Sequence, residues 1–145
     1  MKKVSFVIPC YRSALTIGKV VNEIQDTMNA MENYSYEIIL VNDCSPDDTF
    51  EVISKLCEEN INICGVNLAK NFGQHAALMA GFHQVQGDII ICLDDDGQTP
   101  ACECLKLIDK VNEGNDIVFA EYGERKQSAF RNLGSKFNAL CNHFF

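Results

Sequence analysis

The stretch Ile89-Ile90-Ile91-Cys92-Leu93-Asp94-Asp95-Asp96-Gly97-Gln98-Thr99-Pro100 places three aspartates directly after an apolar run. Such a run is typical of a strand buried on both faces of a parallel sheet, and open α/β sheets bind ligands at the carboxyl ends of their strands. Adjacent carboxylates repel one another unless a cation neutralises them, and oxygen ligands favour Mg²⁺ or Mn²⁺ held together with substrate phosphates. The stretch predicts metal-assisted chemistry on a phosphorylated substrate; the alternative is a solvated acidic turn that starts the next helix.

The rest of the chain alternates between apolar, β-branched runs and segments with helical periodicity. This alternation predicts an α/β fold with a mainly parallel sheet and helices on both faces. No repeat or linker interrupts the pattern, so residues 1–145 are expected to form a single domain. Strands are predicted at residues 4–8, 37–41, 61–66, 88–93 and 116–120, and helices at residues 15–31, 49–59, 75–85 and 102–112.

Composition limits the function classes. A chain of 145 residues with 47% hydrophobic and 22% charged residues can bury a core of its own. The net charge of -8 disfavours a nucleic-acid partner. No apolar stretch approaches the ~18 to 20 residues of a membrane span, and no signal-peptide pattern begins the chain, so a cytoplasmic location is predicted. The eight cysteines lack zinc-site spacing and are expected to be reduced thiols.

The loops after the first two predicted strands contain groups suited to a nucleotide. Tyr11 could stack on a base, and the alternative is a tyrosine that only covers the end of the sheet. Asp43 could accept the imide N–H of a uracil ring. Asp47 is interpreted as a helix N-cap, because it stands just before a helical segment.

These loops, in this order and at this spacing, resemble the signature of glycosyltransferase family 2 on the GT-A fold, the Rossmann-like fold of nucleotide-diphospho-sugar transferases. The matching segments are residues 7–11, 41–49 and 93–100. Residues 71–77 and 130–136 make the chain most similar to the branch of dolichol-phosphate mannosyltransferases and bacterial polyprenyl-phosphate glycosyltransferases. The resemblance covers essentially the whole chain. It implies the N-terminal catalytic part of a longer enzyme, truncated at its C-terminus.

The resemblance implies a donor site with a metal. Asp94 and Asp96 match the two fixed acids of the family's D-x-D motif and would be the catalytic acids. Together with Gln98 they would bind Mg²⁺ or Mn²⁺, whereas Asp95 occupies the variable middle position and is not counted as a ligand. The nucleotide pocket would be lined by Pro9, Tyr11, Asp43 and Asp94.

Two positions depart from the family pattern. Cys44 stands where glycine is common, so the turn there must form without glycine's backbone freedom. Ser13 stands where many relatives have an acidic residue, which weakens any inference about base contacts from that position.

The implied reaction is inverting transfer of a sugar from a UDP- or GDP-sugar to an acceptor, with polyprenyl phosphate expected. Arg125, Arg131 and Ser135 are the candidates to bind the acceptor phosphate, because guanidinium groups bind phosphate bidentately. The alternatives are a truncated module that binds nucleotide-sugar without catalysis, and a transferase acting on a saccharide acceptor for cell-surface polysaccharide. The full-length protein is expected at the cytoplasmic face of the membrane. Core exposed by truncation would favour homo-oligomers.

Two other α/β classes fit the sequence less well. A signalling receiver domain would have paired acids after the first strand, where this chain has Pro9, Cys10 and Tyr11. A dinucleotide-dependent oxidoreductase would have the G-x-G-x-x-G pattern after that strand, and the pattern is absent.

Overall fold

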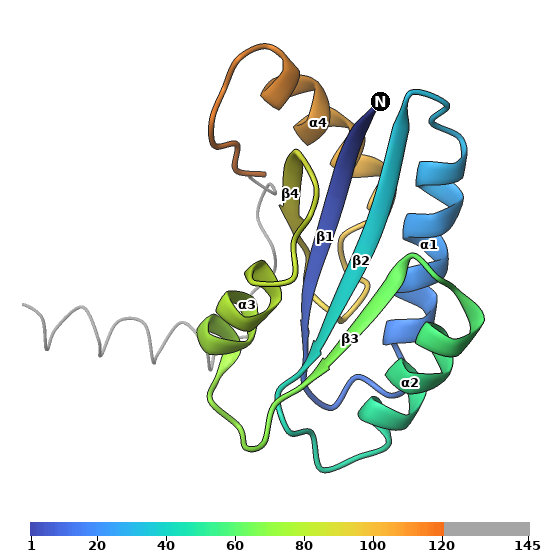
Figure 1. Ribbon diagram of the computed structural model, residues 1–145, viewed down its shortest axis with the longest axis vertical. Coiled ribbons are helices and arrows are strands. Elements are labelled where there is room, and N and C mark those ends of the chain that lie inside the picture. The colour runs from blue at the N-terminus through green and yellow to red at the C-terminus, as the bar shows by residue number, and fades with distance from the viewer. Residues whose placement is uncertain (121–145) are drawn as a thin grey trace, which may run out of the picture.

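A four-stranded parallel sheet forms the centre of the protein, seen in a computed structural model that describes residues 1–120 (Figure 1). The strand order is β3-β2-β1-β4, so the chain extends the sheet in one direction from β1 and then adds β4 on the other side. This arrangement confirms the predicted α/β class with a parallel sheet. The elements are β1 (Lys2–Cys10), α1 (Ile17–Asn29), β2 (Tyr34–Asn42), α2 (Thr49–Glu59), β3 (Ile63–Asn67), α3 (Gln74–Phe82), β4 (Ile89–Cys92), the 3₁₀ turn η1 (Ala101–Glu103) and α4 (Cys104–Asn112).

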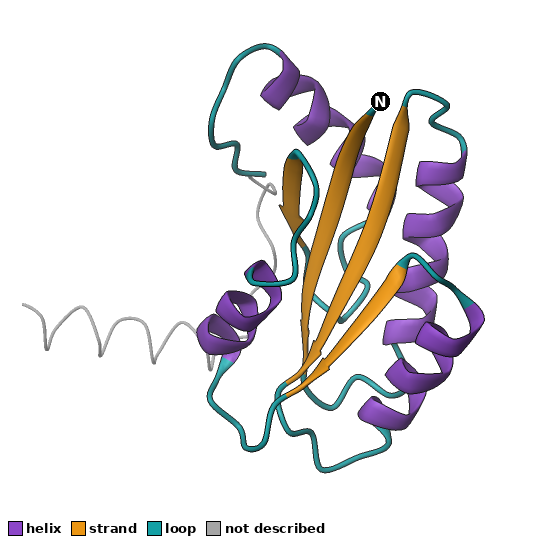
Figure 2. Cartoon of the chain, viewed as in Figure 1, coloured by secondary structure: helices purple, strands orange, loops and turns teal. Residues whose placement is uncertain are grey.

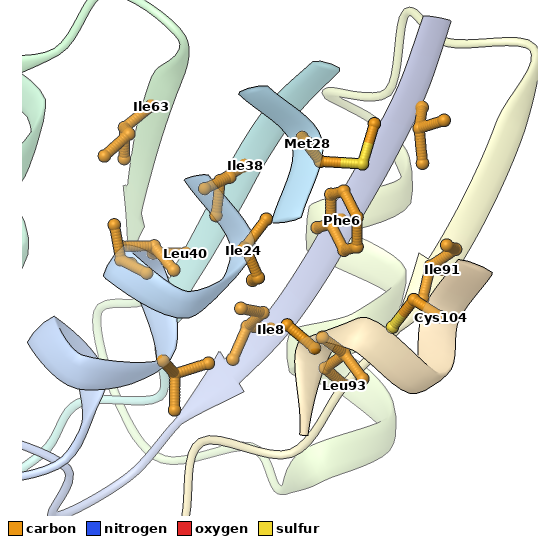
Figure 3. Close-up of a cluster of buried hydrophobic side chains, with 14 of the residues drawn as sticks. Phe6, Ile8, Ile24, Met28, Ile38, Leu40, Ile63, Ile91, Leu93 and Cys104 are labelled. Atoms are coloured by element: carbon orange, nitrogen blue, oxygen red, sulfur yellow. The ribbon is translucent and has the colours of Figure 1, made fainter. Parts of the chain in front are cut away.

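The larger part of the core lies between one face of the sheet and helices α1, α2 and α4. Alternate residues of β1 and β2 point to this face because side chains alternate along a strand. Figure 3 shows the strand side chains meeting Ile24 and Met28 of α1. Helix α1 has an apolar stripe at helical spacing, which is why one of its faces is buried. The strand residues in this cluster include Val4, Phe6, Ile8, Ile38, Leu40, Ile63 and Ile91.

Helix α3 covers the opposite face of the sheet, as predicted for helices on both faces (Figure 1). A smaller cluster forms there from Val7, Ile39, Val41 and Ala77. Gly81 brings the last turn of α3 very close to the sheet: a Cβ atom at this position would lie 2.5 Å from Cγ1 of Val7. Close packing of α3 on this face of the sheet therefore requires a residue without a side chain at position 81.

The predicted fifth strand at residues 116–120 is wrong. These residues form no strand, and the sheet of the described residues ends at β4. Ile117 and Phe119 are 73% and 88% exposed, so the apolar run packs poorly in this part of the chain. An apolar, β-branched run favours a strand only where it pairs with a neighbour and packs on a sheet face. The four other strands and the four helices lie where they are predicted, with ends shifted by a few residues.

All seven cysteines within residues 1–120 are free thiols, as expected from the sequence. Cys141 lies outside the described residues. Cys10 and Cys104 are buried, and burial raises the pKa of the Cys104 thiol to about 11. Across residues 1–120, each helix is too short or too polar to cross a lipid bilayer.

Candidate functional site

A polar pocket of about 390 Å³ lies at the carboxyl ends of the strands, between the loops that follow β1 and β4. The arrowheads of β1, β2 and β3 point to this end of the sheet, where connecting loops gather (Figure 2). The order β3-β2-β1-β4 makes the gap beside β1 the point where the winding direction changes, and α/β sheets bind ligands at such points. The lining residues are Pro9, Cys10, Tyr11, Asp43, Asn71, Gly73, Gln74, Asp94, Asp95 and Asp96.

A larger hollow of about 830 Å³ adjoins this pocket along the outer side of β4. Its lining is mainly apolar and includes residues 89–93 and 116–120, together with side chains of α3 and α4. The two hollows share Pro9, Gln74 and Asp94. The smaller pocket is the candidate site, because polar residues from the loops after all four strands line it.

The loop after β1 places Tyr11 at the pocket. Its side chain is 44% exposed, and the Arg12 guanidinium lies 5.5 Å from the centre of its ring. Arg12 has a φ of 59°, in the left-handed region that non-glycine residues rarely adopt, and its amide donates a 2.6 Å hydrogen bond to Oγ of Ser45. The predicted stacking residue is thus held on a defined loop, is partly exposed and lines the pocket.

Asp43 is buried beside the pocket and fixes the approach to helix α3. One carboxylate oxygen accepts the amide of Phe72 at 2.8 Å, and the other accepts the amide of Gly73, also at 2.8 Å. Gly73 has a φ of +88°, a conformation that favours glycine, and α3 begins at the next residue. Asp43 therefore organises the segment at residues 71–77 as well as lining the pocket. Each carboxylate oxygen keeps a further lone pair, which could accept a hydrogen bond from a base. Recognition of a base by Asp43 stays a prediction.

The three aspartates after β4 differ in their surroundings. Asp94 accepts a 3.4 Å hydrogen bond from Nε2 of Gln74, and Asp96 accepts the amide of Gln98 at 2.9 Å. Both side chains are exposed. Asp95 is half-buried and accepts hydrogen bonds from Ser13 and from the amide of Tyr11. The outer two acids therefore face the solvent side of the loop, and the middle acid joins the loop to β1.

The donor set of the acidic loop fits a hard divalent cation. Across residues 1–120, none of the three aspartates forms a salt bridge, so no described basic side chain neutralises them. The described residues include no group of three histidine, cysteine or acidic side chains arranged as a complete metal site. Two carboxylates completed by substrate phosphates and water are the arrangement Mg²⁺ typically uses. Asp94, Asp96 and Gln98 would be the protein ligands of such an ion.

The loop after β2 contains a strained residue and an organised aspartate. Cys44 has a φ of 50°, so the turn forms with a cysteine in the left-handed conformation that glycine adopts more easily. Oδ1 of Asp47 accepts Oγ of Ser45 at 2.5 Å, Oγ1 of Thr49 at 2.6 Å and the amide of Thr49 at 3.3 Å. Asp47 thus binds the first residue of α2, but the N-cap residue of this helix is Asp48, so the interpretation of Asp47 as the N-cap is wrong by one position.

These hydrogen bonds give a pH prediction for Asp47. The bond from Ser45, followed by that from Thr49, lowers the pKa of Asp47 from 3.8 to about 2. Because the pKa of the folded state is lowered, the stabilisation is present above pH 3.8 and is lost as the pH falls towards 2. Ser45→Ala is expected to raise the pKa towards 3.8. A titration of the Asp47 carboxyl carbon by NMR measures it, and an equal pKa in both proteins would contradict the assigned cause.

The pocket contains the predicted Pro9, Tyr11, Asp43, Asp94 and Asp96, whereas Gln98 lies on the same loop outside the lining set. Three residues that organise the site were not predicted to do so from the sequence: Ser13, Gln74 and Asp95. Gln74 was within a matching segment, but its contact with Asp94 joins residues 20 positions apart and has no sequence signal. The predicted acceptor residues Arg125, Arg131 and Ser135 lie outside the described residues.

The parallel sheet and the acidic pocket at its switch point define an α/β domain with a candidate ligand site at the carboxyl ends of its strands. Comparison of the fold with solved structures gives the GT-A class. The chain aligns with Staphylococcus aureus TarS 1-349 in complex with UDP-GlcNAc at a TM-score of 0.60 and 21% identity, covering 90% of this chain and 38% of that chain. It aligns with the mannosyltransferase PcManGT from Pyrobaculum calidifontis, in complex with GDP-Man and Mn²⁺, at a TM-score of 0.61 and 22% identity, covering 72% and 30%.

The chain belongs to glycosyl transferase family 2, whose sequence profile matches residues 5–144. It is 40% identical over 137 residues to the undecaprenyl-phosphate 4-deoxy-4-formamido-L-arabinose transferase of Klebsiella pneumoniae (strain 342). The protein of the same name from Salmonella choleraesuis (strain SC-B67) is 41% identical over 139 residues. Each match covers 94% of this chain and 42% of the relative, so the chain spans less than half the length of these relatives.

Proposed function

We propose that this chain is the donor-binding catalytic domain of a glycosyltransferase that transfers a sugar from a nucleoside-diphosphate sugar to polyprenyl phosphate. The observation that supports this most is the pocket at the switch point of the sheet, where an exposed tyrosine lies opposite the acidic loop. Membership of glycosyl transferase family 2 supports the reaction class. The names of the similar curated proteins support the acceptor class.

Each group in the pocket has a defined task in this proposal. Tyr11 stacks on the base, and Asp43 holds the segment that begins α3 while lining the base site. Asp94 and Asp96, with Gln98, hold a divalent cation and the donor diphosphate beside it. When bound, Mg²⁺ or Mn²⁺ supplies a Lewis acid that neutralises the charge developing on the diphosphate leaving group. Two structural neighbours support a divalent ion: PcManGT in complex with GDP-Man and Mn²⁺, and glucosyl-3-phosphoglycerate synthase from Mycobacterium tuberculosis in complex with Mn²⁺, UDP and glucosyl-3-phosphoglycerate.

The proposed acceptor requires no strong base in the described domain. A phosphate monoester has a second pKa of about 6, so it is mostly ionised near neutral pH and is already a nucleophile. We propose that Arg125, Arg131 and Ser135 bind this phosphate in the full-length protein at the cytoplasmic face of the membrane. Inversion at the sugar carbon follows if the acceptor oxygen attacks opposite the leaving diphosphate.

Arg131→Ala is expected to weaken binding of a short-chain polyprenyl phosphate by roughly tenfold while leaving nucleotide affinity unchanged, because one charge-assisted contact is lost. Lys55→Ala is a matched control: it removes one positive charge from an exposed position on α2. Equilibrium binding of both ligands to the three proteins measures the effect. An equal loss of nucleotide and lipid-phosphate binding would move Arg131 out of the acceptor site.

Calorimetric titration with UDP, GDP and their common sugar conjugates, each with Mn²⁺ and with chelator, tests the donor site. The expected result is metal-dependent binding of one nucleotide, which would also identify the base. Absence of binding to every nucleotide would contradict the proposal for this chain. Because the chain covers 42% of its curated relatives, a second candidate is a domain that binds donor without transfer. A turnover assay with polyprenyl-phosphate and saccharide acceptors distinguishes the two candidates and the two acceptor classes.

A further inference from the structure

Asp95 joins two loops of the pocket that are far apart in the sequence. Its Oδ2 atom accepts the amide of Tyr11 at 3.0 Å and also accepts the hydroxyl of Ser13. Ser13 is only 2% exposed, so the bond from Ser13 to Asp95 is partly shielded from water, whereas the bond from Tyr11 is exposed. Hydrogen bonds to an ionised carboxylate are stronger than those between neutral groups, and they strengthen further at shielded positions. The middle aspartate is therefore a substantial link between the loops after β1 and β4.

The link extends to the loop after β2. The amide of Ser13 donates to Oγ1 of Thr49 at 2.9 Å, and Oγ1 of Thr49 donates to Asp47 at 2.6 Å. Ser45 also donates to Asp47, and its oxygen accepts the amide of Arg12 at 2.6 Å. The hydrogen bonds return to the β1 loop and form a closed network. The loops after β1, β2 and β4 are thereby connected through side chains.

We propose that Asp95 is a positioning residue, which holds Tyr11 at a fixed place relative to the two outer aspartates of the acidic loop. This inference rests on the proposed function, because the position matters only if one ligand contacts both Tyr11 and that loop. A base stacked on Tyr11 and a diphosphate at Asp94 and Asp96 belong to the same donor molecule. Fixing the loops in advance lowers the entropy lost when that donor binds.

The alternative role for Asp95 is that of a third metal ligand, and two substitutions separate the roles. Both observed hydrogen bonds end on a single oxygen, and an asparagine oxygen in the same place can accept both of them. Asp95→Asn thus keeps both hydrogen bonds in a weaker, neutral form and removes the charge. Asp95→Ala removes both. Asp48→Ala and Asp48→Asn are matched controls, because Asp48 is exposed on the β2 loop and makes no side-chain cap hydrogen bond.

The experiment measures the affinity for UDP and GDP in saturating Mn²⁺, and the affinity for Mn²⁺ alone by EPR of the free ion. Asp95→Ala is expected to weaken nucleotide binding by about tenfold, whereas Asp95→Asn stays within about twofold of the parent protein. The affinity for Mn²⁺ alone stays unchanged in both variants. Equal loss in the alanine and asparagine variants, with weaker Mn²⁺ binding, would overturn the proposal in favour of a metal ligand. An alanine variant equal to the parent protein would also overturn it.

Amide hydrogen exchange at Tyr11 gives a readout that needs no ligand. Loss of the acceptor is expected to accelerate exchange at this amide by about tenfold in Asp95→Ala, and not in Asp95→Asn or Asp48→Ala. If the parent protein binds neither nucleotide, the proposed function fails. Unchanged exchange at Tyr11 in Asp95→Ala would separately overturn the positioning role. If Asp95→Ala does not fold, Ser13→Ala takes its place. That variant removes one of the two bonds, so faster exchange supports the role and unchanged exchange overturns it.

Discussion

Asp96→Ala is expected to abolish the Mn²⁺-dependent part of nucleotide-sugar binding. Asp96 is exposed, and its side chain accepts one hydrogen bond, the 2.9 Å bond from the amide of Gln98. Its loss should leave the core intact while it removes one of two charged ligands. Because substitution of groups that merely support metal ligands costs 10- to 100-fold in affinity, loss of a ligand should cost at least about a hundredfold. Calorimetry with and without chelator measures the metal-dependent part directly.

Asp48→Ala is the control for Asp96→Ala, because it removes a carboxylate from the same edge of the sheet outside the pocket lining. We expect it to retain metal-dependent binding in full. Unchanged metal affinity in Asp96→Ala would remove the acidic loop as the cation site and would favour the alternative of a solvated acidic turn. Equal losses in both variants would indicate a general effect of surface charge.

Gly81→Ala is expected to lower the free energy of unfolding by roughly 1 to 3 kcal/mol, because it overpacks the layer between α3 and the sheet. The added Cβ would lie 2.5 Å from Cγ1 of Val7 and 3.1 Å from Cγ2 of Val41, both in the buried C-terminal parts of nine-residue strands. Neither strand can move away easily, since the opposite face of each packs on α1 and α2. Urea unfolding followed by circular dichroism measures the change.

Gly18→Ala is the matched control for Gly81→Ala, because Gly18 lies in α1 and its added Cβ would meet no atom within 4 Å. Alanine is favoured over glycine within helices by about 1 kcal/mol, so this variant should be slightly more stable than the parent protein. A lower free energy of unfolding in Gly81→Ala together with a higher one in Gly18→Ala would identify close packing as the cause of the loss at position 81. If both variants were equally stabilised, α3 would have to lie farther from the sheet than the structure places it.

The fold was largely predictable where burial alone determines the pattern. Residues 4–10 of β1 and 38–42 of β2 are buried on both faces of the sheet, so their apolar runs follow from their position at its centre. The run at residues 116–120 has a similar composition and forms no strand. Composition reports the preference of a segment for a sheet, whereas pairing also requires a neighbouring strand that local sequence does not specify.

The site was predictable as a set of loops and not as a set of contacts. The positions of Tyr11 and the acidic loop follow from their places after strands of a parallel sheet. Three adjacent aspartates have identical side chains, and only the fold shows that the middle one accepts Tyr11 and Ser13. Similarly, Asp43 is a candidate for base recognition by its position, and the structure adds its two bonds to the segment before α3.

The central place of β1 also constrains the order of folding. β1 begins the chain, yet it pairs with β4 through contacts such as Val4 with Ile89, so synthesis must pass residue 89 before its second edge is covered. The bond between Tyr11 and Asp95 spans 84 positions and requires residue 95, which is synthesised after residue 89. Such long-range pairing slows folding. During translation, we expect the strand made first to wait longest for its partners, and the pocket to form only after the acidic loop has left the ribosome.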